Sequence, residues 1–491
     1  MHYYKKLKLF IGIQFKKITK EFTEFTMIEA GKIVKISKII TVQTNLNVSI
    51  GDIVYIKAFP AIDGTSMGVI TAISNGFFDF RPFFDITGLY FGKPVYTLGE
   101  QFKITIGDNI LGNILDGFGN SLIGKDIDGD KYEIYTKNNT QLKEPTEQLI
   151  TGQRVIDSFF PIYKGESTAI PGGFGTGKTQ LLHQIAKNSN VDIVVYIGCG
   201  ERGNEIAALA ENFTKLDIMK KTTIVATTSD DIVTLREQGI YIGLKIAEYF
   251  SEHRDVLVII DSLSRFAEAL RELMGNEIPV EEGYPSYLEA RLCDVLERSF
   301  ASEKGSLSIV ASISPQGSDT EDYVTGIIKN IAPNLIELDK NLAYARHFPA
   351  VNYLKSYSKN SKKNAVLDIL QKEEEVLEIV SLIGKEVLHD NMKLVLKMAE
   401  AIKQGFLQQN LYHIYDSFSP LHFQKLFLNY IILVYTKALE LIEREIPIRI
   451  LEEEGFFKEV YCIKESPPED FLEHKSKIKK IYRSVLEKYE E

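Results

Sequence analysis

The sequence predicts an α/β protein in three parts: an N-terminal β-barrel, a core built on a mostly parallel sheet, and a C-terminal helical bundle. Three observations predict it. Apolar runs separated by glycines lie near the N-terminus, β-branched runs alternate with helix-length segments in the middle, and apolar residues recur at helical spacing toward the C-terminus. The length of 491 residues allows about three domains of ordinary size.

The barrel is predicted from short apolar runs that glycines separate. The runs occupy residues 33–36, 39–42, 53–56 and 69–73. Strands bounded by turn residues at this density are typical of a small β-barrel or sandwich. We place the barrel domain at residues 27–96.

The first 26 residues differ from the rest. They mix six lysines with apolar residues, and Lys16 and Lys17 interrupt the stretch that would otherwise resemble the apolar part of a signal peptide. Secretion is therefore not expected. We expect residues 1–26 to be a disordered tail, or a start misread upstream of Met27, rather than an amphipathic helix that touches a membrane.

The core domain is placed at residues 97–357. Its β-branched runs occupy residues 167–170, 193–197, 256–260 and 307–313, and helix-length segments alternate with them. This alternation is what a mostly parallel sheet covered by helices requires.

The helical domain is placed at residues 358–491. Apolar residues at helical spacing predict its first two helices: Val366, Ile369, Leu370, Leu377 and Val380, then Leu394, Val395, Met398 and Ile402. The acidic runs at residues 373–375 and 452–454 are interpreted as solvated helix faces.

Composition excludes several classes of protein. With 57 basic and 67 acidic side chains, the formal net charge is -10, so the surface as a whole should repel a phosphate backbone, and nucleic acid is not an expected partner. No run approaches the roughly 18 apolar residues of a membrane-spanning helix. Cys199, Cys293 and Cys462 are far apart and match no zinc spacing, which favours a reduced, intracellular compartment.

A phosphate-binding motif follows the run at residues 167–170. The sequence fits G-x-x-x-x-G-K-[ST] at every fixed position, and its residues are Gly172, Gly173, Phe174, Gly175, Thr176, Gly177, Lys178 and Thr179. The glycines let backbone N–H groups turn inward around a phosphate, and the helix that follows adds its positive end. Lys178 should reach the β- and γ-phosphate oxygens of ATP or ADP, and Thr179 should bind Mg²⁺.

Two carboxylates follow other predicted strands. Asp261 ends the run at residues 256–260, where it suits a role beside Mg²⁺ and equally a helix N-cap. Glu201 follows the run at residues 193–197 in a glycine-rich turn at the same edge of the sheet. From the residues alone, Glu201 suits either a surface position or the activation of water. Cys199 is interpreted as a packing residue.

At this point the chain resembles a known family. Its segments at residues 150–157, 172–179, 195–205, 267–272, 281–285, 346–350 and 406–410 resemble the catalytic A subunit of V-type and A-type rotary ATPases. The resemblance runs from about Met27 to the C-terminal helices. It implies a RecA-like P-loop core between a β-barrel and a helical domain, with ATP hydrolysis or synthesis as the activity.

The resemblance also implies roles for residues of the site. Lys178 and Thr179 match the phosphate and Mg²⁺ ligands, and Glu201 matches the residue that polarises the attacking water. The other matched residues are Arg202 and Arg265 near the phosphates, Asp261 in the magnesium shell, and Phe348 and Phe406 in the aromatic adenine pocket. Core packing remains the alternative for both phenylalanines, and most of all for Phe406.

The partners implied are a B-type subunit that alternates with this chain in an A3B3 ring, a central stalk, a peripheral stalk and an ion-translocating membrane sector for H⁺ or Na⁺. A B subunit would supply the missing arginine finger. The expected location is the cytoplasmic side of a membrane, reached only through the complex. The alternative is a homohexameric, secretion-type ATPase without a B subunit.

The sequence departs from the family pattern in two ways. Unusual residues stand at Gly173, Thr176, Leu263, Phe266, Gln316 and Ser318, although none of them removes a catalytic group. Catalytic A subunits also carry a long insertion before the P-loop domain, whereas only residues 120–148 stand there in this chain. Its loss should spare the chemistry and alter contacts with peripheral parts of the complex.

Overall fold

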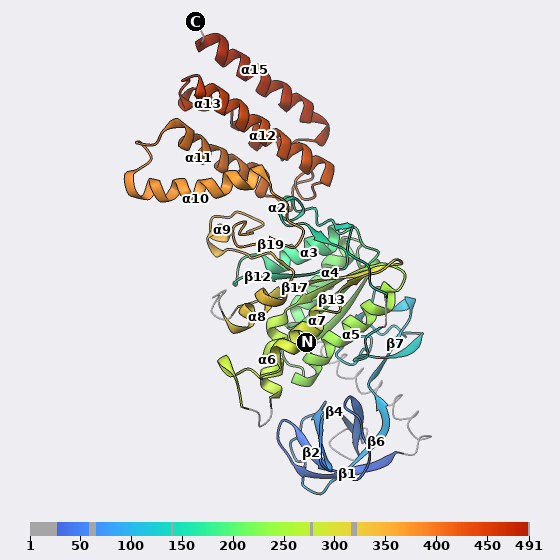
Figure 1. Cartoon of the computed structure of the whole chain (residues 1–491). Helices are drawn as coiled ribbons and strands as arrows, with labels where there is room; N and C mark the ends of the chain where they lie inside the picture. Colours follow the sequence, from blue (N-terminus) through green and yellow to red (C-terminus); the bar gives the residue numbers. More distant parts are fainter. Residues whose placement is uncertain (1–26, 58–64, 139–140, 275–277, 316–321, 490–491) are drawn as a thin grey trace. The chain divides into compact units, whose positions relative to one another are not determined.

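The computed structural model describes residues 27–57, 65–138, 141–274, 278–315 and 322–489 (Figure 1). The predicted extension at residues 1–26 lies outside the described residues. The chain divides into two compact units, which are described separately: unit 1 comprises Met1–Glu144 and Asp192–Ala311, and unit 2 comprises Pro145–Val191 and Ser312–Glu491. Across the described ranges, every helix is too short or too polar to cross a membrane.

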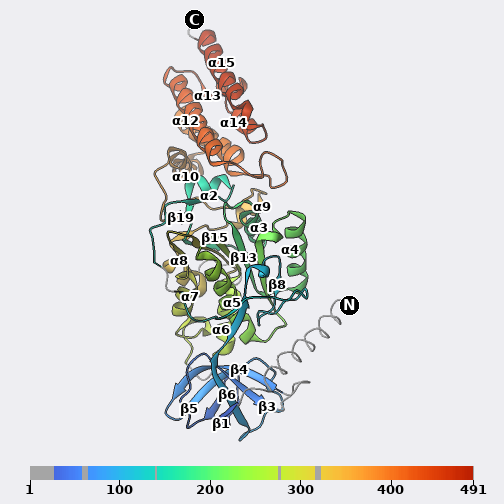
Figure 2. The same cartoon turned by 90° about the vertical axis from the view of Figure 1, so that its right-hand side faces the viewer.

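Unit 1 contains the predicted barrel (Figures 1 and 2), which the described residues close with six strands in the order β1-β2-β5-β4-β3-β6. The strands are β1 (Ile28–Lys35), β2 (Ile40–Gln43), β3 (Asp52–Lys57), β4 (Thr65–Ser74), β5 (Phe77–Pro82) and β6 (Pro94–Gln101). Side chains alternate between the core and the outside, so Ile40 and Val42 are fully buried. A Cβ on Gly68 would lie 2.5 Å from the Phe80 ring, so only glycine lets the strands approach there. Strand β6 runs past the predicted boundary at residue 96.

The rest of unit 1 carries a parallel sheet with the strand order β17-β15-β13-β14-β8. Its strands are β8 (Ile114–Leu115), β13 (Ile193–Glu201), β14 (Thr222–Thr228), β15 (Asp255–Asp261) and β17 (Ser306–Ile313). The short strand β16 (Phe300–Ala301) pairs with β17. A separate two-stranded ribbon consists of β7 (Lys103–Ile106) and β9 (Asp130–Glu133). Three predicted apolar runs form β13, β15 and β17, and nearly every residue in them is buried.

Helices cover this sheet. They are α4 (Gly203–Lys215), α5 (Val233–Ser251), α6 (Leu263–Leu273) and α7 (Leu288–Leu296), with short turns η2 (Asp108–Ile110), η3 (Met219–Lys221) and η4 (Glu281–Gly283). Helix α5 packs closely on β13, since a Cβ on Gly243 would lie 2.4 Å from Ile197 Cδ1. Glu237 of α5 also accepts a hydrogen bond of 2.5 Å from buried Arg81 of β5. The strand that ends in Glu201 is therefore held from one side by a helix that is itself tied to the barrel.

Unit 2 contains the strand and helix that flank the P-loop. Strand β12 (Ser167–Pro171) pairs in parallel with β18 (Asn334–Leu335), which pairs with β19 (Tyr357–Ser358), and β10 (Gln148–Leu149) pairs with β11 (Ile162–Tyr163). The helices are α2 (Arg154–Phe159), α3 (Lys178–Asn188), α8 (Tyr323–Ile331) and α9 (Lys340–Tyr344). Between β9 and β10 the described residues form no further named strand or helix.

The predicted C-terminal helices are confirmed (Figure 1). They are α10 (Ala365–Ile383), α11 (Asp390–Ile402), the π-helical turn η6 (Lys403–Leu407), α12 (Leu421–Glu443), α13 (Ile448–Glu453), α14 (Lys458–Ile463), η7 (Pro468–Asp470) and α15 (Phe471–Tyr489). The apolar residues predicted for α11 are all buried, and so are Val366, Ile369 and Leu370 of α10. Leu377 is exposed, because the buried face of α10 continues through its neighbour Val376 instead.

One acidic run needs correction. Glu374 and Glu375 are exposed as predicted, but Glu373 is buried and its Oε2 lies 2.6 Å from Lys403 Nζ. Glu373 occupies the same helical stripe as Leu370, which carries it into the interior, and a buried charge requires a partner there. In the second run Glu452 and Glu453 are exposed, and Glu454 is half-buried.

Candidate functional site

The predicted P-loop joins β12 to α3. Gly175 and Gly177 have φ angles of +82° and +84°, a conformation that glycine adopts without strain. A Cβ on Gly172 would lie 2.8 Å from Thr176 Oγ1, so the loop closes tightly at its start. Helix α3 begins at Lys178, and its unpaired N–H groups follow the loop directly. The backbone of this segment is that of an anion-binding turn.

Side chains of the P-loop divide between its interior and solvent. The Thr176 hydroxyl donates a 2.8 Å hydrogen bond to the Gly173 carbonyl, so the unusual threonine closes the loop. Lys178 Nζ donates to the Gly173 carbonyl at 3.1 Å and contacts the Gly172 carbonyl. Thr179 and Phe174 are exposed. The lysine charge thus lies over the loop, and the Thr179 hydroxyl is accessible to a ligand.

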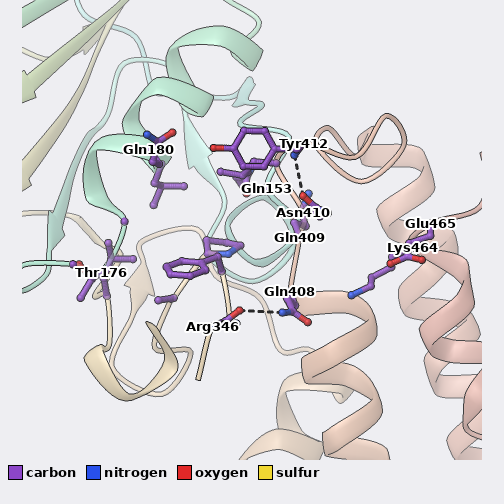
Figure 3. Close-up of a pocket in the computed structure, with 18 residues that line it drawn as sticks. Gln153, Thr176, Gln180, Arg346, Gln408, Gln409, Asn410, Tyr412, Lys464 and Glu465 are labelled. Carbon is purple, nitrogen blue, oxygen red and sulfur yellow. Dashed lines mark hydrogen bonds between the residues drawn. The ribbon is translucent and has the colours of Figure 1, made fainter. Parts of the chain in front are cut away.

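A cavity of about 560 Å³ opens beside the P-loop within unit 2 (Figure 3). It is within the range of roughly 300–1,000 Å³ that is typical of small-molecule sites. Phe348 and Tyr412 line it together with P-loop residues. The Phe348 ring approaches the loop closely, because a Cβ on Gly177 would lie 3.4 Å from it. The two rings offer flat apolar faces of the kind on which a nucleotide base stacks.

Phe406 lies elsewhere. Its side chain is fully buried, and its ring centroid lies 5.9 Å from that of Phe159 and 5.2 Å from that of Phe427. It is not among the residues that line the cavity. The structure therefore places Phe406 in the core, which is the alternative that the sequence left open, and it places Tyr412, which is 91% exposed, at the open edge of the cavity.

A buried arginine fixes the wall of the cavity that contains Tyr412. The Arg154 guanidinium donates to the carbonyls of Phe406 and Gln408, at 2.6 and 2.8 Å, and to the Asp416 carboxylate at 2.6 Å. Both charged side chains are almost completely buried. Because Gln408 and Tyr412 line the cavity, Arg154 determines where this wall lies.

We expect Arg154→Met to lower the free energy of unfolding by about 3–5 kcal/mol, because it leaves the Asp416 carboxylate buried without its charge partner. Urea unfolding of the full chain measures the loss. Arg449→Met is the matched control, since Arg449 pairs with Glu453 on the surface of the same unit and is 85% exposed. An equal effect of the two substitutions would contradict the role assigned to Arg154.

Unit 1 brings Glu201 and Asp261 together. Strands β13 and β15 pair in parallel with Gly198 opposite Asp261, so the strand ends that carry the two carboxylates are neighbours. Asp261 is 7% exposed and accepts a 3.0 Å hydrogen bond from the Tyr196 hydroxyl. Glu201 is half-buried. A fixed carboxylate beside a half-buried one is typical of a functional site.

The proximity of Asp261 alters the titration of Glu201. The pKa of Glu201 is raised to about 8, first by burial and then by the negative charge of Asp261 and the neighbouring Glu205, while Arg265 opposes the shift. Glu201 therefore holds its proton near neutral pH in the chain without nucleotide. A carboxyl group that titrates close to the working pH is suited to proton transfer.

The raised pKa of Glu201 makes stability depend on pH. The unfolded chain releases this proton near the ordinary value of 4.5, and the folded chain releases it near about 8. The contribution of Glu201 to the free energy of unfolding is therefore fully present below pH 4.5 and is lost as the pH rises through about 8. Between acidic and alkaline pH, we expect the free energy of unfolding of the Glu201→Gln chain to fall by about 1–3 kcal/mol less than that of the unmodified chain. Urea unfolding at a series of pH values measures this difference. If the free energies of unfolding of the unmodified and Glu201→Gln chains changed with pH in the same way, this prediction would be wrong.

The two predicted arginines lie at the surface of unit 1. Arg202 is the N-cap residue of α4 and is exposed. Arg265 donates to Glu268 at 2.8 Å, and its Cβ lies 3.5 Å from where a Cβ on Gly200 would be, so it borders the end of β13, which continues to Glu201 through the residues that the sequence suggested form a turn. Burial raises the pKa of the Cys199 thiol to about 12, as expected of a packing residue.

The predicted residues therefore fall into two groups, each gathered within one unit. Unit 2 brings together the P-loop and Phe348, and unit 1 brings together the two carboxylates with Arg265 beside them. Among the unusual residues, Leu263 and Phe266 are buried in α6, while Gln316 and Ser318 lie outside the described residues.

Several residues of the cavity were not predicted. They are Gln153, Arg346, Gln408, Tyr412 and Lys464. Three of them lie inside segments that carry the family resemblance, and Tyr412 lies two positions beyond another such segment. The missing information was which side of each segment faces the cavity, and this depends on contacts with distant parts of the chain.

Family comparisons match most of the described chain. Residues 152–358 match the ATP synthase alpha/beta family nucleotide-binding domain, and residues 359–451 match the C-terminal domain of V and A type ATP synthase.

Individual proteins are similar over a comparable range. A V-type ATP synthase alpha chain 2 of Clostridium tetani is 41% identical over 389 residues, which are 72% of this chain and 65% of the relative. A V-type ATP synthase alpha chain of Halothermothrix orenii is 39% identical over 413 residues, which are 75% and 70% of the two chains. The matched stretch thus spans about two thirds of the length of these relatives.

One solved structure is similar in fold. It is the assembled ATPase EscN from the type III secretion system of enteropathogenic E. coli, with a TM-score of 0.72 and 25% identity, and the match covers 82% of this chain and all of EscN.

Proposed function

Because the chain belongs to the ATP synthase alpha/beta family, among the A subunits of V-type and A-type ATP synthases, we propose that it is the catalytic subunit of a rotary ATPase. It would couple ATP hydrolysis or synthesis to the transport of H⁺ or Na⁺. The observation that carries the proposal is Glu201, a half-buried carboxyl group with a raised pKa, at the end of β13 beside the strand that ends in Asp261. A subunit that only binds nucleotide has no need of such a group.

The P-loop of unit 2 would bind the phosphates of ATP or ADP. Backbone N–H groups at the start of α3 face the phosphate position, and the Lys178 ammonium supplies the positive charge that stabilises the β- and γ-oxygens. In this structure loop carbonyls accept from the ammonium, and phosphate oxygens would replace them as the stronger, charged acceptors. Phe348 and Tyr412 would enclose the base.

The two residue types that the resemblance assigns to Mg²⁺ suit this ion. Mg²⁺ prefers oxygen ligands and retains several waters, so a hydroxyl and an ordering carboxylate suffice when substrate phosphates complete the shell. The Thr179 hydroxyl is exposed at the first turn of α3, and the Asp261 carboxylate is held by Tyr196. When bound, the ion would neutralise the charge that develops on the phosphates. Thr179 and Asp261 are the residues that we propose hold it.

Glu201 would orient the attacking water and accept its proton. With its ordinary pKa the carboxylate would be a weaker base, whereas with a pKa of about 8 the fraction that is ionised near neutral pH is a stronger base and accepts the proton more readily. Arg202 follows Glu201 directly and Arg265 borders the end of the same strand, and by the family resemblance these two arginines would stabilise charge on the phosphates. A neighbouring B-type subunit would add an arginine finger, so we expect the isolated chain to hydrolyse ATP slowly.

The test is to purify the native complex, identify its subunits and measure its ATP turnover. An alternating ring of this chain with a B-type subunit, stalk subunits and a membrane sector would support the proposal. A homohexamer of this chain alone would support the secretion-type alternative, which the similarity to EscN favours. The match of residues 359–451 to the V and A type C-terminal domain favours the first outcome.

A further inference from the structure

The side-chain amide of Gln153 is buried and unused. Gln153 has no exposed surface, and neither its Oε1 nor its Nε2 has a hydrogen-bond partner among the described residues. It is the N-cap residue of α2, yet its side chain does not cap the helix. Instead it is one of the residues that line the cavity beside the P-loop (Figure 3), although its amide atoms are covered in this structure. Buried polar groups without partners are rare, and one in the wall of a cavity indicates a ligand group that meets it once the side chain turns toward the cavity.

The other amides at this wall of the cavity are already engaged. Gln408 donates to the Arg346 carbonyl at 3.1 Å, and the Asn410 side-chain oxygen accepts from the Tyr412 N–H at 3.0 Å. Gln409 donates to two backbone carbonyls. These three side chains hold the wall in place. Gln180, which also lines the cavity, is exposed, so Gln153 is the buried amide there that keeps a complete donor and acceptor pair for a ligand.

The backbone holds Gln153 in a fixed position. Its N–H donates to the Thr151 hydroxyl at 3.1 Å, and Asp157 accepts from the N–H groups of Thr151 and Gly152, both at 2.9 Å. The following residue, Arg154, is fixed by its own buried hydrogen bonds. An amide on such a rigid turn binds a ligand with little loss of conformational freedom.

We propose that Gln153 selects adenine by pairing with the N6 and N7 edge of the base. The proposal rests on the proposed function, which places a nucleotide at the P-loop. The N6 amino group donates and N7 accepts, and one amide satisfies both. On the same edge guanine offers two acceptors, O6 and N7, so the amide Nε2 would pair with one of them and Oε1 would face the other. The base stacks beside Phe348 while its edge meets Gln153.

The test is nucleotide binding to the full chain, measured by calorimetry with ATP, 7-deaza-ATP and GTP. 7-deaza-ATP lacks only the N7 acceptor. We expect the unmodified chain to bind ATP more tightly than either analogue. Gln153→Met, which keeps the side-chain length, should reduce the ratio of ATP to GTP affinity by about 5- to 150-fold and remove the preference over 7-deaza-ATP. Gln371→Met, on the exposed face of α10, should leave both ratios unchanged.

The outcomes separate this proposal from the proposed function. If the unmodified chain binds none of the three nucleotides, the proposed function fails and this inference fails with it. If it binds ATP but Gln153→Met keeps both ratios, only the role of Gln153 is overturned. Equal affinity of the unmodified chain for ATP and 7-deaza-ATP overturns that role as well, and this measurement does not depend on whether the variant folds.

Discussion

Replacing Glu201 with Gln lowers the ATP turnover of the reconstituted ring by about 10²–10⁴-fold and leaves nucleotide binding nearly intact. The amide retains the size of the side chain but accepts no proton from the attacking water. Binding depends on the P-loop and the cavity, and both belong to unit 2, whereas Glu201 belongs to unit 1. Turnover is measured with a coupled ATPase assay, and affinity by calorimetry on the same preparation.

Glu211→Gln is the matched control for this prediction. Glu211 lies on α4 close to Glu201 in the sequence, but its side chain is 68% exposed and paired with Lys215. Its substitution should leave turnover unchanged. If the Glu201→Gln ring turned over at the rate of the unmodified ring, the catalytic assignment of Glu201 would be wrong even though the chain binds ATP.

Replacing Lys178 with Ala abolishes ATP binding at ordinary concentrations, with an expected loss of affinity of about 10²-fold or more. The ammonium makes charge-assisted hydrogen bonds to phosphate oxygens, each worth roughly 1.5–3 kcal/mol, and the loop has no second lysine to replace it. Equilibrium dialysis with ATP measures the loss. Folding should be spared, because Lys178 begins a helix and alanine is a good helix former.

Lys187→Ala serves as the control here, since it removes the same charge from the last turn of the same helix. A Lys178→Ala chain with normal affinity for ATP would show that the P-loop does not hold the phosphates. Together with the Glu201 experiment, this separates a failure of binding from a failure of chemistry.

Much of the fold followed from local patterns. Runs such as residues 256–260 are buried on both faces of a parallel sheet, so their continuous apolar character identified β15 directly. The helical spacing of Leu394 to Ile402 identified α11 in the same way. The spacing of apolar residues was a less reliable guide at the end of α10, where Leu377 is exposed. The sequence does not show which of the apolar residues there a neighbouring helix covers.

The candidate site was predictable where its residues are close in sequence. The P-loop is a continuous motif, Asp261 ends one predicted strand and Glu201 follows another, so the edge of the sheet on which they lie followed from the chain direction. The raised pKa of Glu201 did not follow, because it depends on burial and on a carboxylate sixty residues away in the sequence.

The sequence by itself determined the order of barrel, α/β core and helical bundle, the phosphate-binding motif, and the two carboxylates, because periodicity and short motifs are local properties of the chain. Only the tertiary structure decided that Phe406 packs in the core while Tyr412 lines the cavity, and that the Gln153 amide is buried there without a partner. These outcomes rest on contacts such as Arg154 with Asp416, which join residues far apart in sequence. Such contacts leave no periodic signal in either segment.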